Sequence, residues 1–324
     1  MEEKLHGIVT KGIGGLYGVR LMNRDVSCRA RGRFRSEGIS PLPGDDVILL
    51  PDGDEYVIDE ILPRRSELIR PATANLTHLF LLLPACRPKP DLLTADKITS
   101  IAENAKIETV VVVGKSDLDH ENAALVAEIY KSAGYNVFTL SSVTGEGVTE
   151  LKKFIDSEAA RGGASGVPMR AAFAGVSGAG KSTLIGTLFP DLKLATGDVS
   201  RKTERGRHTT RAVELFTLTG ESESEFYLAD TPGFSMIDFT RFNFFPAELL
   251  ADNFREFSEC LGKCRYTKCT HTKEEGCAVL EKMARGEVHP SRHEGYVTIF
   301  EELKRKPEWK RRREEAEKTH GRSK

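Results

Sequence analysis

The stretch AAFAGVSGAGKST, Ala171–Thr183, runs from apolar residues through a glycine-rich turn into residues typical of a helix start. Within it, GVSGAGKS matches the phosphate-loop pattern in full, between an apolar strand and a helix, as that pattern requires. Glycines let main-chain N–H groups surround a β-phosphate, Lys181 brings a charge to the β- and γ-oxygens, and Ser182 offers a hydroxyl to Mg²⁺. The stretch therefore predicts a nucleotide site formed by Gly175, Val176, Ser177, Gly178, Ala179, Gly180, Lys181, Ser182 and Thr183.

A second apolar run that ends in a polar turn, VVVVGKSD at Val110–Asp117, precedes the phosphate loop. The Asp117 carboxylate can accept hydrogen bonds from guanine N1–H and its exocyclic amine, and adenine lacks this pair of donors. A buried carboxylate left unpaired by adenine would discriminate between the two bases. Lys115 would lay its aliphatic stem along the base. The later loop SSVTGEG, which starts at Ser141, resembles one that supports the same base through a backbone N–H.

The order of these loops is the reverse of that in ordinary GTPases, where the phosphate loop comes first. Strands that alternate with amphipathic helices after Pro71 predict a parallel sheet covered on both faces. The carboxyl ends of such strands meet at one edge, whatever their order in the chain. We interpret the reversal as a circular permutation. The glycine-rich stretch RGGASGVP, residues 161–168, is expected to be a linker within this domain.

The segment FYLADTPGF follows the phosphate loop and places Asp230 and Gly233 at the end of another strand. There the carboxylate could hold Mg²⁺ through water, and the Gly233 N–H could reach the γ-phosphate. The intervening GDVSRKTERGRHTTR is polar and aperiodic, as expected of a switch loop. Thr209 or Thr210 could give Mg²⁺ its second hydroxyl, and the sequence does not choose between them.

The first seventy or so residues contain short β-prone runs separated by Gly- and Pro-rich turns. About five short strands with a glycine loop suggest a small barrel of the OB type. Alternate arginines in RARGRFR would lie on one face of a strand, either as a solvated surface or as a phosphate-binding stripe. The favoured interpretation is an RNA-binding stripe formed by Arg29, Arg31, Arg33 and Arg35.

Composition limits the class of protein. The chain has 324 residues, enough for two or three domains, and its 39% hydrophobic and 29% charged content fits an ordinary soluble protein. The start lacks the apolar core of a signal peptide and no apolar stretch is long enough to span a membrane, so we expect a cytoplasmic location. The basic segment that begins at Lys304 is either a solvated tail or a nucleic-acid contact.

Taken together, these motifs resemble the ribosome-small-subunit-dependent GTPase A family, bacterial GTPases that act late in small-subunit maturation. The most specific features are the reversed loop order and GRHTT, which accompany DTPG and the phosphate loop over nearly the whole chain. The resemblance implies an OB barrel at residues 1–70, a permuted GTPase at 71–242 and a mainly helical zinc domain at 243–324. It also implies GTP hydrolysis with Mg²⁺, stimulation by the small (30S) subunit and contact with 16S rRNA. A monomer suits such a ribosome-bound factor.

Near the C-terminus, CLGKCRYTKCTHTKEEGC concentrates four of the six cysteines in a short polar stretch. This crowding favours a metal site in a reducing compartment over disulfides, although redox-active or merely buried thiols are the alternative. Three thiolates and an imidazole suit one structural, tetrahedral Zn²⁺. Cys260 could compete as a ligand, but the family spacing favours Cys264, Cys269, His271 and Cys277.

Two residues depart from common GTPase patterns. Gly114 stands where the family usually has an asparagine that contacts guanine, so specificity should depend on Asp117, unless the site is degenerate. Phe234 follows DTPG where many GTPases have a water-orienting glutamine, and His208 in GRHTT is the candidate substitute. Alternatively, His208 is only an exposed loop histidine. A P-loop ATPase or kinase with RNA-binding modules, or a GTP-binding protein with little turnover, remains the competing interpretation.

Overall fold

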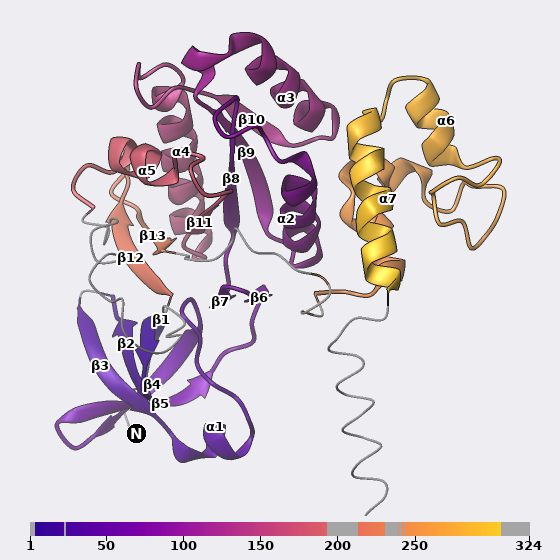
Figure 1. Cartoon of the computed structure of the whole chain (residues 1–324). Helices are drawn as coiled ribbons and strands as arrows, with labels where there is room; N and C mark the ends of the chain where they lie inside the picture. The colour runs from indigo at the N-terminus through magenta and orange to yellow at the C-terminus, as the bar shows by residue number, and fades with distance from the viewer. Residues whose placement is uncertain are drawn as a thin grey trace, which may run out of the picture.

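The structure is a computed structural model of the chain, and it describes residues 4–22, 24–192, 213–230, 239, 242 and 244–305. The chain forms three parts: a small barrel, a large sheet flanked by helices, and a C-terminal helical unit (Figure 1). The strands are β1 (Leu5–Ile13), β2 (Leu16–Arg20), β3 (Asp25–Ala30), β4 (Asp46–Asp52), β5 (Glu55–Ile61), β6 (Glu67–Ile69), β7 (Ala72–Ala74), β8 (His78–Pro84), β9 (Glu108–Gly114), β10 (Asn136–Thr139), β11 (Arg170–Ala174), β12 (Glu214–Thr219) and β13 (Glu225–Asp230). The α-helices are α1 (Gly32–Ser36), α2 (Leu92–Asn104), α3 (His120–Ser132), α4 (Val148–Ser165), α5 (Lys181–Leu188), α6 (Ala278–Ala284) and α7 (Pro290–Lys304).

The N-terminal strands close into a five-stranded barrel. Their order is β1-β2-β3-β5-β4, and β4 pairs back to β1, so the barrel has no free edge between these strands. Alternate apolar side chains point inward and form a separate small core that includes Val9, Val19, Leu49 and Ile58. A short helix, α1, lies between β3 and β4, as in OB folds. The prediction of an OB-type barrel is confirmed.

The prediction that four arginines share one strand face is wrong. Strand β3 ends at Ala30, and the chain turns into α1 at Gly32. Arg29 is therefore on the strand, Arg31 precedes the helix, and Arg33 and Arg35 are on it, although all four are exposed. Burial of Phe34 against the barrel core favours the helical turn, which breaks the period-two spacing that the sequence suggested.

The central sheet carries the permuted order. Five strands run parallel in the order β10-β9-β8-β11-β13, so the strand that leads into the phosphate loop, β11, lies between β8 and β13. β12 then pairs antiparallel to β13 at the edge. The strands that precede and follow the phosphate loop in the chain thus build one continuous sheet, and the predicted permutation is confirmed.

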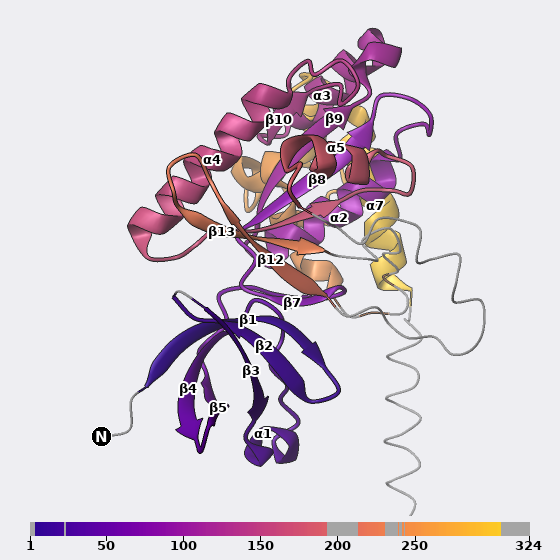
Figure 2. The same cartoon turned by 90° about the vertical axis from the view of Figure 1, so that its left-hand side faces the viewer.

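Helices cover both faces of this sheet, as predicted (Figure 2). Alternate residues of β8 divide between two cores: Leu79, Leu81 and Leu83 pack with α2 and α3, whereas Phe80 and Leu82 pack with α4 and α5. Nearly continuous apolar strands are required because neither face meets water.

The expected linker at residues 161–168 is mostly helical. Helix α4 continues to Ser165 and ends at Gly166, which adopts φ 72° and donates its N–H to carbonyls of the last turn. Glycine is needed at position 162 because the Cβ of any other residue there would lie only 2.8 Å from Val167 O. Packing of the buried residues Leu151, Ile155 and Ala159 stabilises the helix, and only the short stretch after Gly166 connects it to β11.

The barrel and the central sheet are joined by backbone pairing as well as by the chain. β1 pairs with β12, with Lys11 opposite Glu214, so that eleven strands form one sheet. An ion pair of 2.6 Å between Arg20 and Glu225 crosses the same joint. Arg170, fully buried at the start of β11, donates to the Asp46 carboxylate of the barrel. These contacts fix the barrel beside the strand of the phosphate loop.

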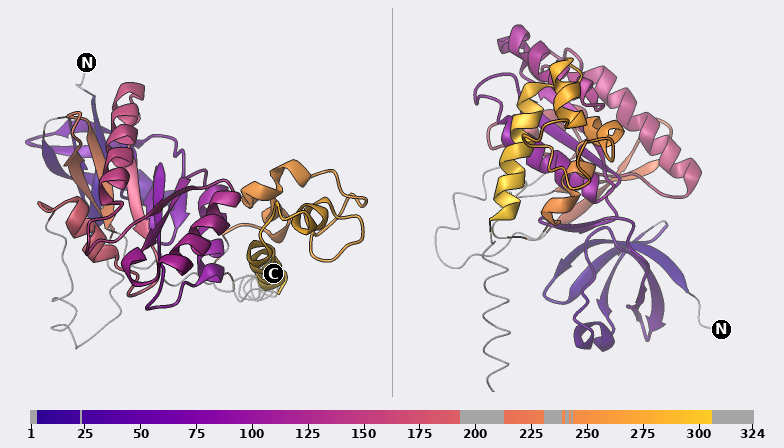
Figure 3. Two further views of the ribbon diagram at one scale, coloured as in Figure 1. Left: turned by 90° about the horizontal axis from the view of Figure 1, so that it is seen from above. Right: turned by 90° about the vertical axis from the view of Figure 1, so that its right-hand side faces the viewer.

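The C-terminal unit packs against α2 through α7 (Figure 3). Its apolar side chains, among them Phe254, Phe257 and Ile299, belong to the same core as α2 and α3. Within this interface the buried guanidinium of Arg292 donates to Asp96 of α2 and, at 2.7 Å, to Glu256. Among the described residues, no helix is long and apolar enough to cross a membrane.

Candidate functional site

The predicted nucleotide-binding residues gather at the carboxyl ends of the parallel strands. Gly114 ends β9 opposite Pro84 of β8, and Asp230 ends β13. The phosphate loop follows β11 between them. A parallel sheet brings these ends together at one edge, which is where open α/β sheets bind ligands.

The backbone of the phosphate loop needs its glycines. Gly175 has φ 144° and Gly180 has φ 103°, conformations that residues with a side chain rarely adopt. A Cβ on Gly175 would lie 2.4 Å from Leu82 O of the neighbouring strand. Ser177 and Gly178 at the tip of the loop are exposed, and α5 begins at Lys181. Apart from the Ala179 N–H, which donates to Val176 O at 3.2 Å, the loop presents its N–H groups at a helix start, an arrangement suited to phosphates.

Lys181 turns back over the loop. Its Nζ donates to Gly175 O at 2.6 Å and to Val176 O at 3.3 Å. Burial lowers its pKa from the ordinary lysine value. Carbonyl dipoles alone compensate a buried ammonium less well than anionic oxygens do, so this group favours a phosphate at the mouth of the loop.

Lys115 connects the loop after β9, residues 114–117 (the guanine loop), to the phosphate loop. It adopts φ 59°, and its Nζ donates to Gly178 O at 2.8 Å and also to Arg87 O. Asp117 follows in a short 3-10 turn, Ser116–Leu118, and its partly exposed carboxylate forms no hydrogen bond or ion pair with any described residue. An acceptor that is held in place but unpaired is what guanine recognition requires.

The loop after β10, residues 141–147 (the serine loop), lies beside the guanine loop. Ser141 is fully buried, and its Oγ accepts hydrogen bonds from the N–H groups of Val143 and Thr144 at 3.3 and 3.2 Å. The Ser116 N–H donates to Leu140 O at 3.2 Å and ties the two loops together. The structure therefore brings the predicted base-binding elements into contact with one another.

Gly114 leaves little space beside the phosphate loop. A Cβ built there would lie 3.0 Å from Leu82 Cδ1 and 4.0 Å from Ala179 O. Leu82 Cδ1 is the end of a flexible side chain, so a larger residue at this position would need only a small adjustment. The absence of the usual asparagine is therefore not forced by packing.

The predicted magnesium and catalytic residues are only partly described. Ser182 is exposed at the start of α5, and Asp230 is exposed at the end of β13, beside β11. Thr209, Thr210 and His208 lie outside the described residues, as do Gly233 and Phe234. Two of the proposed magnesium ligands are thus placed at the same sheet edge as the phosphate loop.

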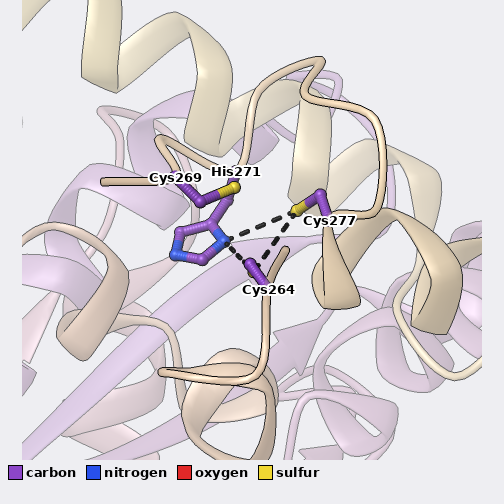
Figure 4. A group of neighbouring side chains, drawn as sticks. All are labelled: Cys264, Cys269, His271 and Cys277. Carbon is purple, nitrogen blue, oxygen red and sulfur yellow. Dashed lines mark hydrogen bonds between the residues drawn. The ribbon is translucent and has the colours of Figure 1, made fainter. Parts of the chain in front are cut away.

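A second candidate site is the Cys/His cluster of the C-terminal unit (Figure 4). One ligand atom from each of Cys264, Cys269, His271 and Cys277 lies within 4.8 Å of the other three. His271 Nδ1 is 3.5 Å from the sulfurs of both Cys264 and Cys277, which are 4.0 Å apart. Tetrahedral zinc with bonds of about 2.3 Å to sulfur and 2.0 Å to nitrogen separates its ligands by roughly 3.5–3.8 Å. The donor set fits zinc.

The loop that carries these ligands is shaped by Glu274. Its carboxylate accepts hydrogen bonds from the N–H groups of Thr270, Thr272 and Lys273. Partial burial raises the pKa of Glu274, but these bonds and one from the Thr270 hydroxyl outweigh it and lower the pKa to about 2. Burial raises the pKa of Cys269 to about 12, so its thiolate needs a neighbouring cation. Cys260 lies outside the cluster and contacts Ala278 O at 3.6 Å.

Two features of the site were missed by sequence reasoning. The segment between β8 and α2 reaches the site through Arg87 O, which shares the Lys115 ammonium with Gly178 O of the phosphate loop, yet its sequence matches no nucleotide-binding motif. The buried group of Arg292, Asp96 and Glu256 joins residues far apart in the chain. Only a helical spacing of apolar residues around Asp96 could have hinted that this carboxylate is buried.

Comparison with known proteins yields two family models and many relatives. The model described as RsgA GTPase matches residues 61–240, and that of the RsgA N-terminal domain matches residues 6–56. The small ribosomal subunit biogenesis GTPase RsgA of Ruminiclostridium cellulolyticum is 38% identical over 96% of this chain and 97% of its own length. The protein of the same name from Caldanaerobacter subterraneus is 37% identical over 94% and 97%.

Solved structures show the same architecture. YjeQ from Thermotoga maritima superposes with a TM-score of 0.75 at 31% identity and covers 93% of this chain and 99% of its own. YloQ, described as a circularly permuted GTPase, gives a TM-score of 0.70 at 28% identity and covers 93% and 96%.

Proposed function

Since this chain belongs to the RsgA family of GTPases, we propose that it hydrolyses GTP during biogenesis of the small ribosomal subunit. One observation supports this function most directly: Lys115 joins the guanine loop to the phosphate loop at one sheet edge, despite their reversed order. A site with both loops in contact can read the base and hold the phosphates of the same nucleotide.

The proposed nucleotide contacts follow from the residues at this edge. Asp117 accepts hydrogen bonds from guanine, and the N–H groups of the phosphate loop hold the phosphates together with Lys181. Ser182, Asp230 and either Thr209 or Thr210 would hold Mg²⁺, which neutralises charge that develops on the phosphate oxygens. His208 would orient or deprotonate the attacking water, and the Gly233 N–H would reach the γ-phosphate.

We propose a structural zinc at the Cys/His cluster. Cys264, Cys269, His271 and Cys277 would hold it in a closed site with no open position for a substrate. Its contribution is to fold the loop between η5 (Arg255–Cys260) and α6, which has few apolar residues of its own. Exposed cations on this loop, Arg265 and Lys268, then face solvent on a stable support.

The proposed partner is the small (30S) ribosomal subunit, contacted through its 16S rRNA. The proposed RNA-binding groups are four exposed arginines of the barrel, Arg29, Arg31, Arg33 and Arg35, and the basic residues Arg265 and Lys268 of the loop between η5 and α6. We propose that the protein acts as a monomer in the cytoplasm, with functional divisions at residues 1–70, 71–242 and 243–324.

Phosphate release from GTP and from ATP, each with and without purified small subunits, tests this function. We expect GTP-selective release that rises strongly with subunits. Equal use of both nucleotides would indicate a P-loop ATPase or kinase. Nucleotide binding without release, in the presence of subunits, would indicate a protein that uses GTP only as a ligand.

A further inference from the structure

The segment that connects β8 to α2, ACRPKPD at Ala85–Asp91, lines the nucleotide site. Its main-chain carbonyl at Arg87 and the phosphate-loop carbonyl at Gly178 accept hydrogen bonds from the same ammonium of Lys115. Pro88 lies against the phosphate loop as well, since a Cβ on Gly178 would be 3.6 Å from Pro88 Cδ. The segment thus forms a third wall of the site, beside the guanine and phosphate loops.

This wall is held firmly. The Ala85 N–H donates to Gly114 O at 2.8 Å, and Ala85 O accepts a hydrogen bond from Asn122 of α3. At its other end Asp91 caps α2 by accepting the N–H of Thr94 at 3.0 Å. Anchors at both ends and in the middle fix where the Arg87 backbone lies.

Arg87 adopts a backbone conformation that residues with a side chain seldom use. Its φ is 47°, in the left-handed region, as is that of Lys115, whose ammonium it binds. Such a residue costs on the order of 1–3 kcal/mol and persists only where its surroundings impose it. Arg87 and Lys115 are both left-handed and are bonded to each other at this site, so the conformation of Arg87 is imposed by the contact that also joins the two loops.

The side chain of Arg87 is exposed and forms no hydrogen bond, ion pair or ring contact with any described residue. Buried arginines elsewhere behave differently: Arg292 and Arg170 are each held by carboxylates. The backbone of Arg87 is held beside a loop that is shaped for phosphates, and its side chain carries a guanidinium without a partner among the described residues. The complement of such a group is an anionic oxygen of the nucleotide.

We propose that Arg87 is a nucleotide-binding residue whose guanidinium contacts the α- or β-phosphate. Gly178 belongs to the part of the loop whose N–H groups cradle these phosphates, whereas Lys181 reaches the β- and γ-oxygens. Arg87 approaches from the side of the guanine loop, through Lys115. The contact is therefore common to GDP and GTP and binds ground state and transition state alike, so it lowers KM without changing kcat. This inference rests on the proposed function.

Titration of the full-length protein with fluorescent (N-methylanthraniloyl) GDP and GTP tests the contact. In Arg87→Ala we expect both dissociation constants to rise by about tenfold, as the loss of one charge-assisted hydrogen bond implies. With small subunits present, KM should rise by the same factor while kcat is unchanged. Arg87→Lys should restore part of the affinity, because it keeps the charge and loses only the fork of donors.

Lys106→Ala is the matched control. Lys106 is exposed and has φ 58°, so alanine meets the same backbone strain there, but it lies between α2 and β9 at the opposite edge of the sheet. Its nucleotide affinities should equal those of the wild type. A similar loss in Lys106→Ala would show that the effect comes from backbone strain and would overturn the inference.

Other outcomes separate this inference from the function on which it rests. If the wild type binds neither GDP nor GTP, the proposed function fails. If the wild type binds both and Arg87→Ala binds them equally well, the phosphate contact is wrong. A loss confined to affinity for small subunits would assign Arg87 to RNA, and a loss for GTP alone would assign it to the γ-phosphate; each result overturns the proposal.

Discussion

At the scale of single residues, Gly114 is the most informative position of the guanine loop. The structure gives no steric reason for glycine, because only the end of the Leu82 side chain approaches the position of a Cβ. Its main chain is bonded in the sheet edge through Ala85, so the loop keeps its course without a side chain at this residue. Compared with a site that has asparagine at this position, the site lacks one side-chain contact between the guanine and phosphate loops.

Restoring that side chain should strengthen nucleotide binding. In Gly114→Asn the amide could reach Ala179 O, which lies 4.0 Å from the position of the Cβ. One added hydrogen bond of about 1 kcal/mol predicts a roughly fivefold lower dissociation constant for GDP and GTP. Calorimetric titration measures it, and Gly114→Leu, which adds bulk without the amide, is the control. Equal affinities of Gly114→Asn and wild type would show that Lys115 alone suffices to couple the loops.

Asp117 should determine base preference. Its carboxylate forms no bond with the described residues and is available to guanine. Asp117→Asn presents a donor to guanine N1–H and should weaken GTP binding about 100-fold, whereas xanthosine triphosphate, with a carbonyl at that edge, should lose much less. Competition between the two nucleotides measures the ratio. Unchanged discrimination would remove Asp117 from the base-binding role.

His208 is a candidate only by sequence. If it orients water in place of the glutamine that Phe234 replaces, His208→Ala should lower subunit-stimulated turnover by about 100-fold and leave the GTP dissociation constant unchanged. Single-turnover kinetics with purified subunits, beside a binding titration, separates the two effects. Retained stimulation would place the role on another group.

At the scale of elements, the loop between η5 and α6 carries the four proposed zinc ligands. It is joined to α7 by hydrogen bonds of 2.8 Å from Tyr296 to Thr270 O and between His293 and His271 O. These bonds place the cluster on the helix that packs against α2. Loss of the metal should therefore loosen the attachment of the whole C-terminal unit.

Removal of one ligand tests the zinc site. Cys277→Ser should no longer bind one zinc per chain. Its free energy of unfolding should be lower by at least about 3 kcal/mol, because a structural site contributes its binding free energy to folding. Elemental analysis and thermal melting measure both effects. Cys260→Ser is the matched control, since Cys260 is buried nearby but outside the cluster, and it should keep one zinc per chain. Zinc loss in the control instead would make Cys260 a ligand.

At the scale of the whole molecule, the buried ionic group between α2 and the C-terminal unit limits how these parts can move. Arg292 and Asp96 are each about 1% exposed, and Gly295 must lack a side chain because a Cβ would lie 2.0 Å from Asp96 Oδ2. The group therefore holds the C-terminal unit against α2. Removal of one partner of such a buried group typically costs about 3–5 kcal/mol.

Asp96 should make this interface pH-dependent. Burial, with a smaller contribution from the nearby Glu256 carboxylate, raises its pKa to about 6, even though Arg292 and Tyr130 bind it. The folded protein then holds this proton more tightly than the unfolded chain, so unfolding free energy falls as pH rises towards 6 and is level above it. Between pH 5 and pH 7 the wild type should lose about 1 kcal/mol relative to Asp96→Asn. Denaturant unfolding of both proteins measures the difference, and parallel curves would contradict it.

The joint between barrel and sheet is the other feature of this scale. β12 is bonded to the barrel on one side and to β13 on the other, and β13 ends at Asp230. The barrel, which carries the arginines proposed to bind RNA, is therefore attached by backbone pairing to β12, the neighbour of the strand that ends at Asp230.

The sequence by itself determined the local chemistry of this protein. The glycines of the phosphate loop and the barrel strands were predicted because each depends on spacing within a short stretch, and the order of the loops follows directly from the order of their motifs. The choice of Cys264, Cys269, His271 and Cys277 over Cys260 came from the family resemblance, and the structure brings these four together. The alternation of apolar strands and helices also sufficed to predict a sheet covered on both faces. Family resemblance then added the expected activity, which the comparisons support.

Only the tertiary structure decided where such local preferences give way. Packing of Phe34 turned the arginine stretch into a helix, and packing of Leu151, Ile155 and Ala159 carried α4 through a glycine-rich stretch. The pairing of β1 with β12, the burial of Arg292 and the position of Arg87 beside the phosphate loop all join residues distant in the chain. Long-range contacts of this kind leave no spacing in the sequence, because their energy comes from surfaces that meet only after folding.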